Sequence, residues 1–282
     1  MNWILRCAQN DILLFLFLTF FSANLFASSA DDVRKLAASG ELEKAALQAY
    51  ITSGGKDGAE MLALTARLLD ELHDQFSERY EKKCYWVSGA PQTPECMKKG
   101  AKELNEKFGN NAFRYIGGES IAYIEYTGSH YERILKKYKK SSFAEEAEFY
   151  LLLQDLQGHP DAVLKRVQRY REKHKSGEWG RRANLLWARV NEDVCFVWRK
   201  WTWVVYNGTI SDDELIIKSE PYRQEALRTY ESLIKNDAGS LEAKLAAEDL
   251  QKLKTQGDDG ALYSITNDSA PGTWKKWGLR VP

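Results

Sequence analysis

The sequence has no excess of charge of either sign, because 40 Lys and Arg residues balance 40 Asp and Glu residues. A protein that attracts nucleic acid or an acidic substrate through its overall field needs a clear basic excess, so we expect neither partner. Charge is uneven only locally, with a basic excess over residues 131–182 and an acidic excess over residues 212–268. Both segments are typical of solvated helix faces; the alternative is a binding surface with a basic and an acidic end.

Recognisable catalytic motifs are also lacking. There is no phosphate-binding glycine loop, no His-Glu-x-x-His and no Gly-x-Ser-x-Gly. The four histidines are scattered: His73, His130, His159 and His174. We expect His73 and His159 to lie on the surface or to cap helices. The carboxylate pair Glu145-Glu146 is expected on a solvated helix face. The sequence therefore predicts a protein that is not an enzyme, and no cofactor.

Only four cysteines are present, and no second Cys or His pair lies at zinc-ligand spacing. In an oxidising compartment Cys84 and Cys96 can close a short loop, and such a bridge contributes about 3 kcal/mol. The alternatives are two free thiols, or one of the pair bonded to Cys195. A nucleophilic pair of Cys84 with His130 is disfavoured, because Cys84 has a bridge partner and no orienting acid is evident.

Beyond the N-terminus, the sequence is strongly polar and has no apolar run of the ~20 residues that a membrane-spanning helix needs. Arg6 precedes an apolar run over residues 12–21, and small residues follow at 27–30. This order is typical of a secretory signal. We expect residues 1–27 to be a signal peptide, with cleavage after Ala27 or Ala30, and a periplasmic or secreted protein without stable membrane insertion. An uncleaved anchor is the alternative. A lipid-anchored cysteine follows the apolar run of its signal, but Cys7 precedes the run here. We therefore do not expect a lipid anchor.

Residues 131–190 carry the clearest pattern, which predicts two consecutive helical hairpins. Apolar residues recur at helical spacing in four segments, with breaks at Ser141-Ser142 and at Lys175-Ser176-Gly177. The members are Tyr131, Ile134, Leu135 and Tyr138; Ala144, Ala147 and Leu151; Val163, Val167 and Tyr170; and Ala183, Leu186, Trp187 and Val190. A helix pair that recurs after roughly 34 residues is typical of a solenoid.

Two more hairpins are predicted on either side. The first has helices over residues 42–50 and 61–72. The last follows Pro221, with helices over residues 226–234 and, capped by Ser240, over residues 241–253. Alanines in both hairpins would let the helices cross closely. We expect residues 28–255 to form one repeat domain, followed by an irregular tail over residues 256–282 in which Trp274 and Trp277 pack back on the array.

Residues 80–130 interrupt the periodicity and predict an irregular insertion. After the cysteine loop we expect a helix over residues 97–108. Residues 113–126 alternate in polarity around Gly117-Gly118, which is typical of a β-hairpin, and a helix is an equal alternative. Insertions on helical arrays often carry the binding face.

Residues 194–220 form a second interruption, with Trp198, Trp201 and Trp203 close together. We favour a helix over residues 194–206. The alternative is a strand, because Asn207-Gly208 is a hairpin signal and residues 209–217 could pair with it. The acidic run at residues 212–214 favours a helix start instead. The tryptophans are either core between repeats or an aromatic binding face.

The helical hairpins resemble the tetratricopeptide repeats of exported bacterial envelope proteins, especially outer-membrane assembly lipoproteins. The residues that carry the resemblance are Tyr138, Ser142, Ala144 and Ala147; Tyr230, Ser240, Ala243 and Ala246; and Tyr170, Ser176 and Ala183. The family's usual proline at the turn is absent. The resemblance implies an all-α fold, a short right-handed α-solenoid with the disulfide-containing insertion, and an exported scaffold that holds a peptide or protein.

Three functions follow from these observations. The favoured one is a scaffold for protein or peptide binding, with Tyr138 and Tyr170 among the candidate binding residues. The second is a glycan or small-molecule module that uses Trp198, Trp201 and Trp203, since aromatic faces suit sugar rings. The third is an enzyme with a site that no motif identifies.

Overall fold

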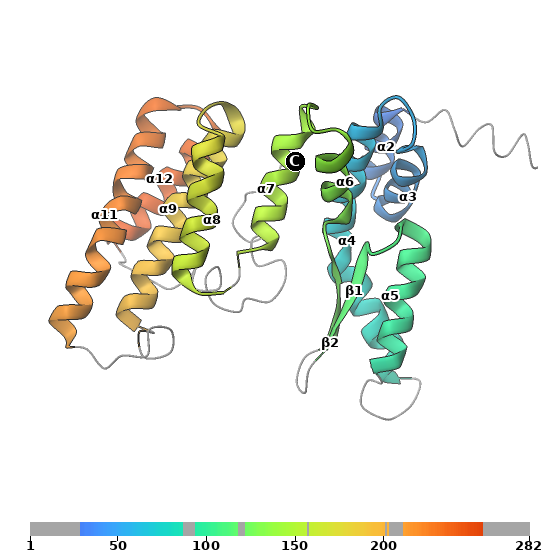
Figure 1. Ribbon diagram of the computed structural model, residues 1–282, viewed down its shortest axis with the longest axis horizontal. Helices are drawn as coiled ribbons and strands as arrows, with labels where there is room; N and C mark the ends of the chain where they lie inside the picture. Colours follow the sequence, from blue (N-terminus) through green and yellow to red (C-terminus); the bar gives the residue numbers. More distant parts are fainter. Residues whose placement is uncertain are drawn as a thin grey trace, which may run out of the picture. The chain divides into compact units, whose positions relative to one another are not determined.

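The computed structural model describes residues 29–86, 94–117, 122–156, 158–200, 202 and 211–255. These residues divide into two compact units, with the boundary between Ala147 and Glu148. Helices make up most of both units, which confirms the predominantly helical class (Figure 1). The expected signal peptide, the Asn207-Gly208 hairpin signal and the C-terminal tail lie outside the described residues.

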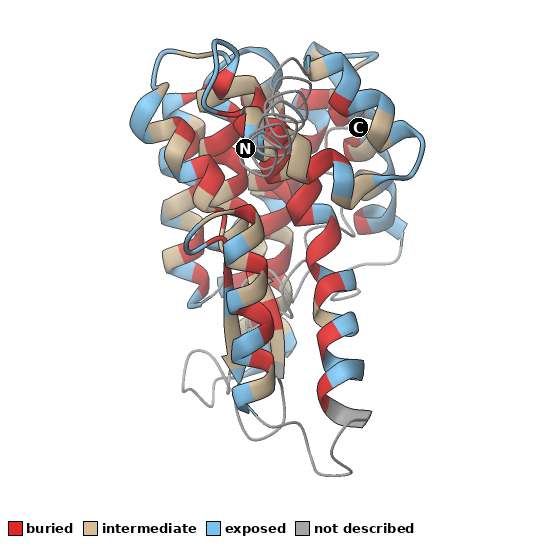
Figure 2. Cartoon of the chain, turned by 90° about the vertical axis from the view of Figure 1, so that its right-hand side faces the viewer, coloured by how far each residue is buried: buried red, intermediate tan, exposed pale blue. Residues whose placement is uncertain are grey.

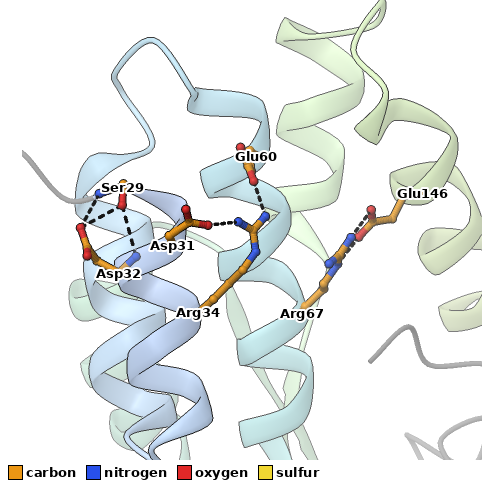
Figure 3. Close-up of polar contacts among 7 residues, drawn as sticks. All are labelled: Ser29, Asp31, Asp32, Arg34, Glu60, Arg67 and Glu146. Atoms are coloured by element: carbon orange, nitrogen blue, oxygen red, sulfur yellow. Dashed lines mark hydrogen bonds and ion pairs between the residues drawn. The ribbon is translucent and has the colours of Figure 1, made fainter.

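Three helices open unit 1: α2 (Ala30–Ala38), α3 (Leu42–Thr52) and α4 (Gly58–Trp86). Ser29 caps α2, because its hydroxyl accepts the Asp32 N–H and the Asp32 carboxylate accepts the Ser29 N–H. Arg34 bonds both Asp31 and Glu60, which ties α2 to α4 (Figure 3). The predicted hairpin over residues 42–72 is confirmed, but α4 continues through Tyr80, where we expected the periodicity to end.

The disulfide and the next helix follow α4. Cys84 and Cys96 are bonded at an S–S distance of 2.09 Å, as the sequence predicts, which excludes a bridge from either residue to Cys195. Helix α5 (Pro94–Phe108) begins at a proline, which is suited to a first helical position because the missing N–H would have no partner there. The expected helix over residues 97–108 is therefore confirmed and starts one turn earlier.

A β-hairpin follows α5, formed by β1 (Phe113–Gly117) and β2 (Ala122–Tyr126) in antiparallel register with Phe113 opposite Tyr126. This settles the open alternative between hairpin and helix. The Asn105 side chain of α5 bonds both backbone groups of Phe113. Its Oδ1 accepts the Phe113 N–H at 2.8 Å, and its Nδ2 donates to the Phe113 carbonyl at 2.9 Å. Ser77 of α4 accepts the outward N–H of Ile124 at 3.1 Å. Side chains thus cover part of both strand edges, which would otherwise be open to pairing with another chain.

Helices α6 (Ser129–Lys137) and α7 (Phe143–Gln154) form where the repeat pattern predicts them. The expectation that Glu146 lies on a solvated face is wrong. Its side chain is 4% exposed and accepts two hydrogen bonds from Arg67 of α4 (Figure 3). The burial follows from the 3.6-residue period, because Glu146 stands beside the buried Ala147 and one turn before the buried Tyr150.

Unit 2 contains the rest of α7 and four longer helices: α8 (Pro160–Lys173), α9 (Gly177–Lys200), α11 (Asp212–Asn236) and α12 (Leu241–Thr255). The predicted hairpin of residues 163–190 is confirmed as α8 and α9, and the favoured helix over residues 194–206 is confirmed as far as Lys200. Helices α8, α9 and α11 run side by side (Figure 1).

The last hairpin begins earlier than the sequence predicts. We expected it after Pro221, but α11 starts at Asp212 and contains that proline. Ser211 caps the helix by accepting the Glu214 N–H, and three acidic residues fill the first turn. A proline lacks the N–H that would bond the carbonyl four residues earlier, here Ile217, whose 70% exposure leaves that carbonyl near solvent. A strand over residues 212–217 is therefore excluded.

Buried residues recur along the inward side of the helices (Figure 2). Two ion pairs connect α12 to α9. Arg182 faces Glu242 at 3.4 Å and Arg189 faces Asp249 at 2.7 Å, both across to α9. The two pairs share an offset of 60 residues (242 − 182 and 249 − 189), so α9 and α12 run parallel. Leu241, an expected core residue, is 46% exposed.

Within the described ranges, no helix has both the length and the apolar character needed to cross a bilayer.

Candidate binding face

One side of α9 in unit 2 carries two half-buried tryptophans. Trp187, Asn191 and Trp198 follow one another by four and seven residues, which places them on one helical face. Arg182 and Arg189 point elsewhere, to α12. The tryptophan side therefore lies between α8 and α11. We call the set of Trp187 and Trp198 with Arg171 of α8 and Tyr222 and Glu225 of α11 the tryptophan face.

Trp187 is held by charged groups from both flanking helices. The Arg171 guanidinium lies 5.4 Å from the centre of the Trp187 ring and donates to Asn184 at 2.6 Å. The Trp187 indole N–H donates to Glu225 at 2.8 Å. Arg171 also approaches Glu225, at 3.8 Å. This arrangement orders the indole ring and both charged side chains, while all three remain partly exposed.

The Glu225 carboxylate is kept ionised at this position. Partial burial opposes ionisation, but hydrogen bonds from Trp187 and Arg228 and the nearby charge of Arg171 hold the pKa of Glu225 below its usual value. The tryptophan face therefore carries the negative charge of Glu225 beside the positive charge of Arg171.

Trp198 has a similar environment at the other end of the face. The Lys218 ammonium lies 5.2 Å from the centre of its ring, and Tyr222 of α11 is a neighbour. Burial and the Asp161 carboxylate raise the pKa of Tyr222, against a smaller opposite effect of Trp198. Tyr222 is therefore a neutral phenol on α11, with the Asp161 charge at the start of α8 nearby.

The structure brings only one of the predicted binding residues into this face. Trp198 belongs to it, whereas Trp201 and Trp203 lie outside the described residues. Tyr170 is buried in unit 2, with ring-centre distances of 5.5 Å to Phe149 and 4.4 Å to His174. It is a packing residue of the α7–α8 contact.

Tyr138 lies in unit 1, at the end of α6. A side chain at Gly58 would overlap its hydroxyl group, so Tyr138 packs closely against the start of α4. Its role in the fold is to close the contact between α4 and α6.

The histidines occupy structural positions. His159 caps α8 by accepting the Asp161 N–H, as the sequence predicts. The prediction of a surface position for His73 is wrong, because its residue is 5% exposed and its Nδ1 lies 2.8 Å from the Asp70 carbonyl. His130 is buried between Phe108 and Tyr126. The disulfide at Cys84 removes the thiol that a pair with His130 would need.

Other parts of the described chain offer less chemistry. Among the residues described, no three His, Cys, Asp or Glu side chains gather as metal ligands would. A shallow hollow lies on α2 and α3, lined by Asp32, Lys35, Leu36, Ser39, Lys44 and Gln48. It is open to solvent and its lysines and carboxylate form no catalytic arrangement.

Sequence reasoning named Trp187 only as a core residue and did not name Arg171, Tyr222 or Glu225. One signal was available: Trp187 precedes Trp198 by eleven residues, three helical turns, so a helix through both puts them on one side. The flanking residues come from other helices, and their approach depends on how the helices pack.

No protein-family model, curated protein or solved structure matches this chain. The tetratricopeptide resemblance of the hairpins stays a prediction.

Proposed function

We propose that the protein is an exported helical-repeat scaffold that binds a protein or peptide partner on the tryptophan face of unit 2. The observation that carries the proposal is the gathering of Trp187, Trp198, Tyr222 and Arg171, all partly exposed, on one side of three adjacent helices. Tryptophan, tyrosine and arginine are the residue types that dominate the binding energy of protein interfaces.

The order of the face supports a preformed site. The Trp187 ring is fixed by the Arg171 contact and by its hydrogen bond to Glu225, so little side-chain freedom remains to be lost when a partner binds. Side chains that are ordered before association lower the entropic cost of binding. A partner that buries Trp187 would also exclude water from the adjacent Arg171–Glu225 pair.

A scaffold of stacked hairpins is supported by the helix order of unit 2. The turn between α8 and α9 and that between α11 and α12 are short, as in repeat arrays. We propose a tetratricopeptide-like arrangement for these pairs, with export directed by residues 1–27.

A glycan is a weaker candidate ligand for the same face. Sugar rings stack on open aromatic faces, but Arg171 covers one face of the Trp187 ring and Lys218 covers one face of the Trp198 ring. The two indoles are also separated by eleven residues, about 16 Å along a helix. Titration of the tryptophan fluorescence with cell-wall fragments separates the two ligands, because a saturable emission shift would favour the glycan.

Photo-crosslinking in intact cells tests the proposal. Gln168 of α8 stands one turn before Arg171, beside the tryptophan face, whereas Gln251 is an exposed glutamine of α12. A photoreactive amino acid at position 168 should give a discrete protein adduct, and one at position 251 should not. Equal adducts at both positions, or none at either, contradict the proposal.

A further inference from the structure

A basic cluster lies at one end of unit 1. It consists of Lys136 and Lys137 in the last turn of α6 and Lys139 and Lys140 in the turn that follows. All four lysines are exposed, and within the described residues none has a carboxylate within 4.0 Å. In contrast, Lys107 and Arg79 of the same unit are both paired with Glu43.

The favourable effect of lysines at a helix C-terminus accounts for two of these residues at most. Cations in the last turn interact with the helix dipole, and this effect falls off within that turn. Lys139 and Lys140 follow the helix end, with Tyr138 anchored between the two pairs against Gly58. The four exposed lysines therefore flank a tyrosine that packs against the start of α4.

The position of the cluster indicates what surface it would meet. Tyr138 packs at the first turn of α4, and Glu60 in the same turn bonds Arg34 near the start of α2. The chain enters unit 1 at Ser29, shortly after the apolar run of residues 12–21. The basic cluster and the chain entry therefore lie beside the same turn of α4. The export proposed above, directed by residues 1–27, would bring this end of the unit next to a membrane.

Two acidic groups near the chain entry are already engaged within the unit, whereas Asp57, next to Gly58, is exposed. Asp31 pairs with Arg34, and Asp32 forms the capping box with Ser29. Glu132, one turn before the cluster, is the nearest acidic residue on α6 itself. The positive charge of the four lysines is therefore only partly offset.

From this geometry we infer that Lys136, Lys137, Lys139 and Lys140 form a peripheral docking surface for anionic lipid headgroups. Flexible, unpaired lysines suit the many mobile charges of a bilayer surface, and each contributes about a five-fold gain in partitioning near an anionic membrane. An acidic peptide would be held better by preorganised donors such as paired arginines. This inference rests on the export proposed above but not on the proposed partner-binding function.

Vesicle co-sedimentation tests the inference on the protein purified from cells that express it. The measured quantity is the ratio of its partition coefficients on vesicles with 30 mol% phosphatidylglycerol (roughly the composition that gives a strong anionic surface) and on pure phosphatidylcholine vesicles. We expect a ratio on the order of 100 or more at low salt, which falls as salt screens the charges. Replacing the four lysines with glutamine should bring the ratio near one.

A matched variant controls for net charge. Lys99, Lys165, Lys235 and Lys244 are also exposed but are dispersed over the described chain, and their replacement with glutamine changes the net charge equally. This control should keep the ratio of the unmodified protein, and thermal melts should show all three proteins folded. The inference is overturned if the ratio is near one for the unmodified protein, if both variants lose it equally, or if polyglutamate binds in a lysine-dependent way while vesicles do not.

Discussion

Arg67 of α4 donates from two guanidinium nitrogens to the two carboxylate oxygens of Glu146 on α7, and the Glu146 side chain is 4% exposed. The pair joins helices 79 residues apart in the sequence. A bidentate arginine–carboxylate pair combines two charge-assisted hydrogen bonds with a fixed geometry. Arg67 and Glu146 therefore fix the start of α7 against α4.

Replacement of Arg67 with methionine should lower the free energy of unfolding by roughly 3 kcal/mol, because the buried Glu146 carboxylate would lose its counter-charge. Arg67 keeps 29% of its side chain exposed, which places the loss at the low end of the usual range. Urea unfolding measures this. Replacement of the exposed neighbour Glu145 with alanine is the control and should cost less than about 0.5 kcal/mol. Equal effects of the two substitutions would contradict the assigned role of the pair.

Asn105 offers a second test, at the β-hairpin. Its amide bonds both backbone groups of Phe113, so replacement with alanine should cost about 1–3 kcal/mol by leaving two backbone groups without partners. Hydrogen exchange should show faster exchange at the Phe113 amide. Aspartate at position 105 keeps only the acceptor and should protect that amide, which distinguishes the specific bond from general destabilisation.

The sequence predicts the positions of the helices well, but it predicts poorly which side chains contact one another. The 3.6-residue period located α3, α4, α6, α7, α8 and α9. The short spacing of Cys84 and Cys96, together with the expected oxidising compartment, favoured the bridge that the structure contains. The errors concern polar residues that the fold buries. Glu146 and His73 were expected on the surface because both are polar. In the structure Glu146 is buried with Arg67 as its partner, and His73 is buried with its Nδ1 close to the Asp70 carbonyl.

The pH dependence of stability should report on His130. Burial lowers the pKa of His130 to about 4, from an ordinary value of 6.5, against a smaller opposite effect of the Phe108 carbonyl. The folded state keeps the ring neutral while the unfolded chain takes up a proton between these values. The contribution of His130 is therefore present above pH 6.5 and is lost as the pH falls toward 4, by about 3 kcal/mol in total.

Chemical denaturation at several pH values measures how steeply the free energy of unfolding changes with pH. Glutamine at position 130 does not titrate and can still bond the Phe108 carbonyl and the Tyr126 hydroxyl, so the variant should show a flatter dependence between pH 4 and 6.5. The same slope in both proteins would show that other groups cause it.

The parallel ion pairs between α9 and α12 give a test by double-mutant cycle. Replacement of Arg189 with methionine leaves Asp249, 15% exposed, without its partner and should cost roughly 3 kcal/mol. Combining it with replacement of Asp249 by leucine should recover most of that loss, because an apolar pair of similar volume needs no counter-charge. Additive losses would indicate that the two residues act independently.

The tryptophan face shows the same limit of sequence reasoning. Trp198 was identified from composition, but Arg171 and Glu225 reach Trp187 from α8 and α11, and no local pattern marks them. Helix packing, which the period does not encode, brings the three side chains together.

The most direct test of partner binding on the tryptophan face combines the photo-crosslink at position 168 with replacement of Trp187 by alanine, in intact cells. Trp179, which packs on Phe149 of α7, is the matched tryptophan to replace with alanine as a control. We expect a discrete adduct at position 168 that disappears with Trp187 and persists, at equal protein level, without Trp179. An adduct that is unchanged without Trp187 would contradict the assignment of the tryptophan face as the binding surface.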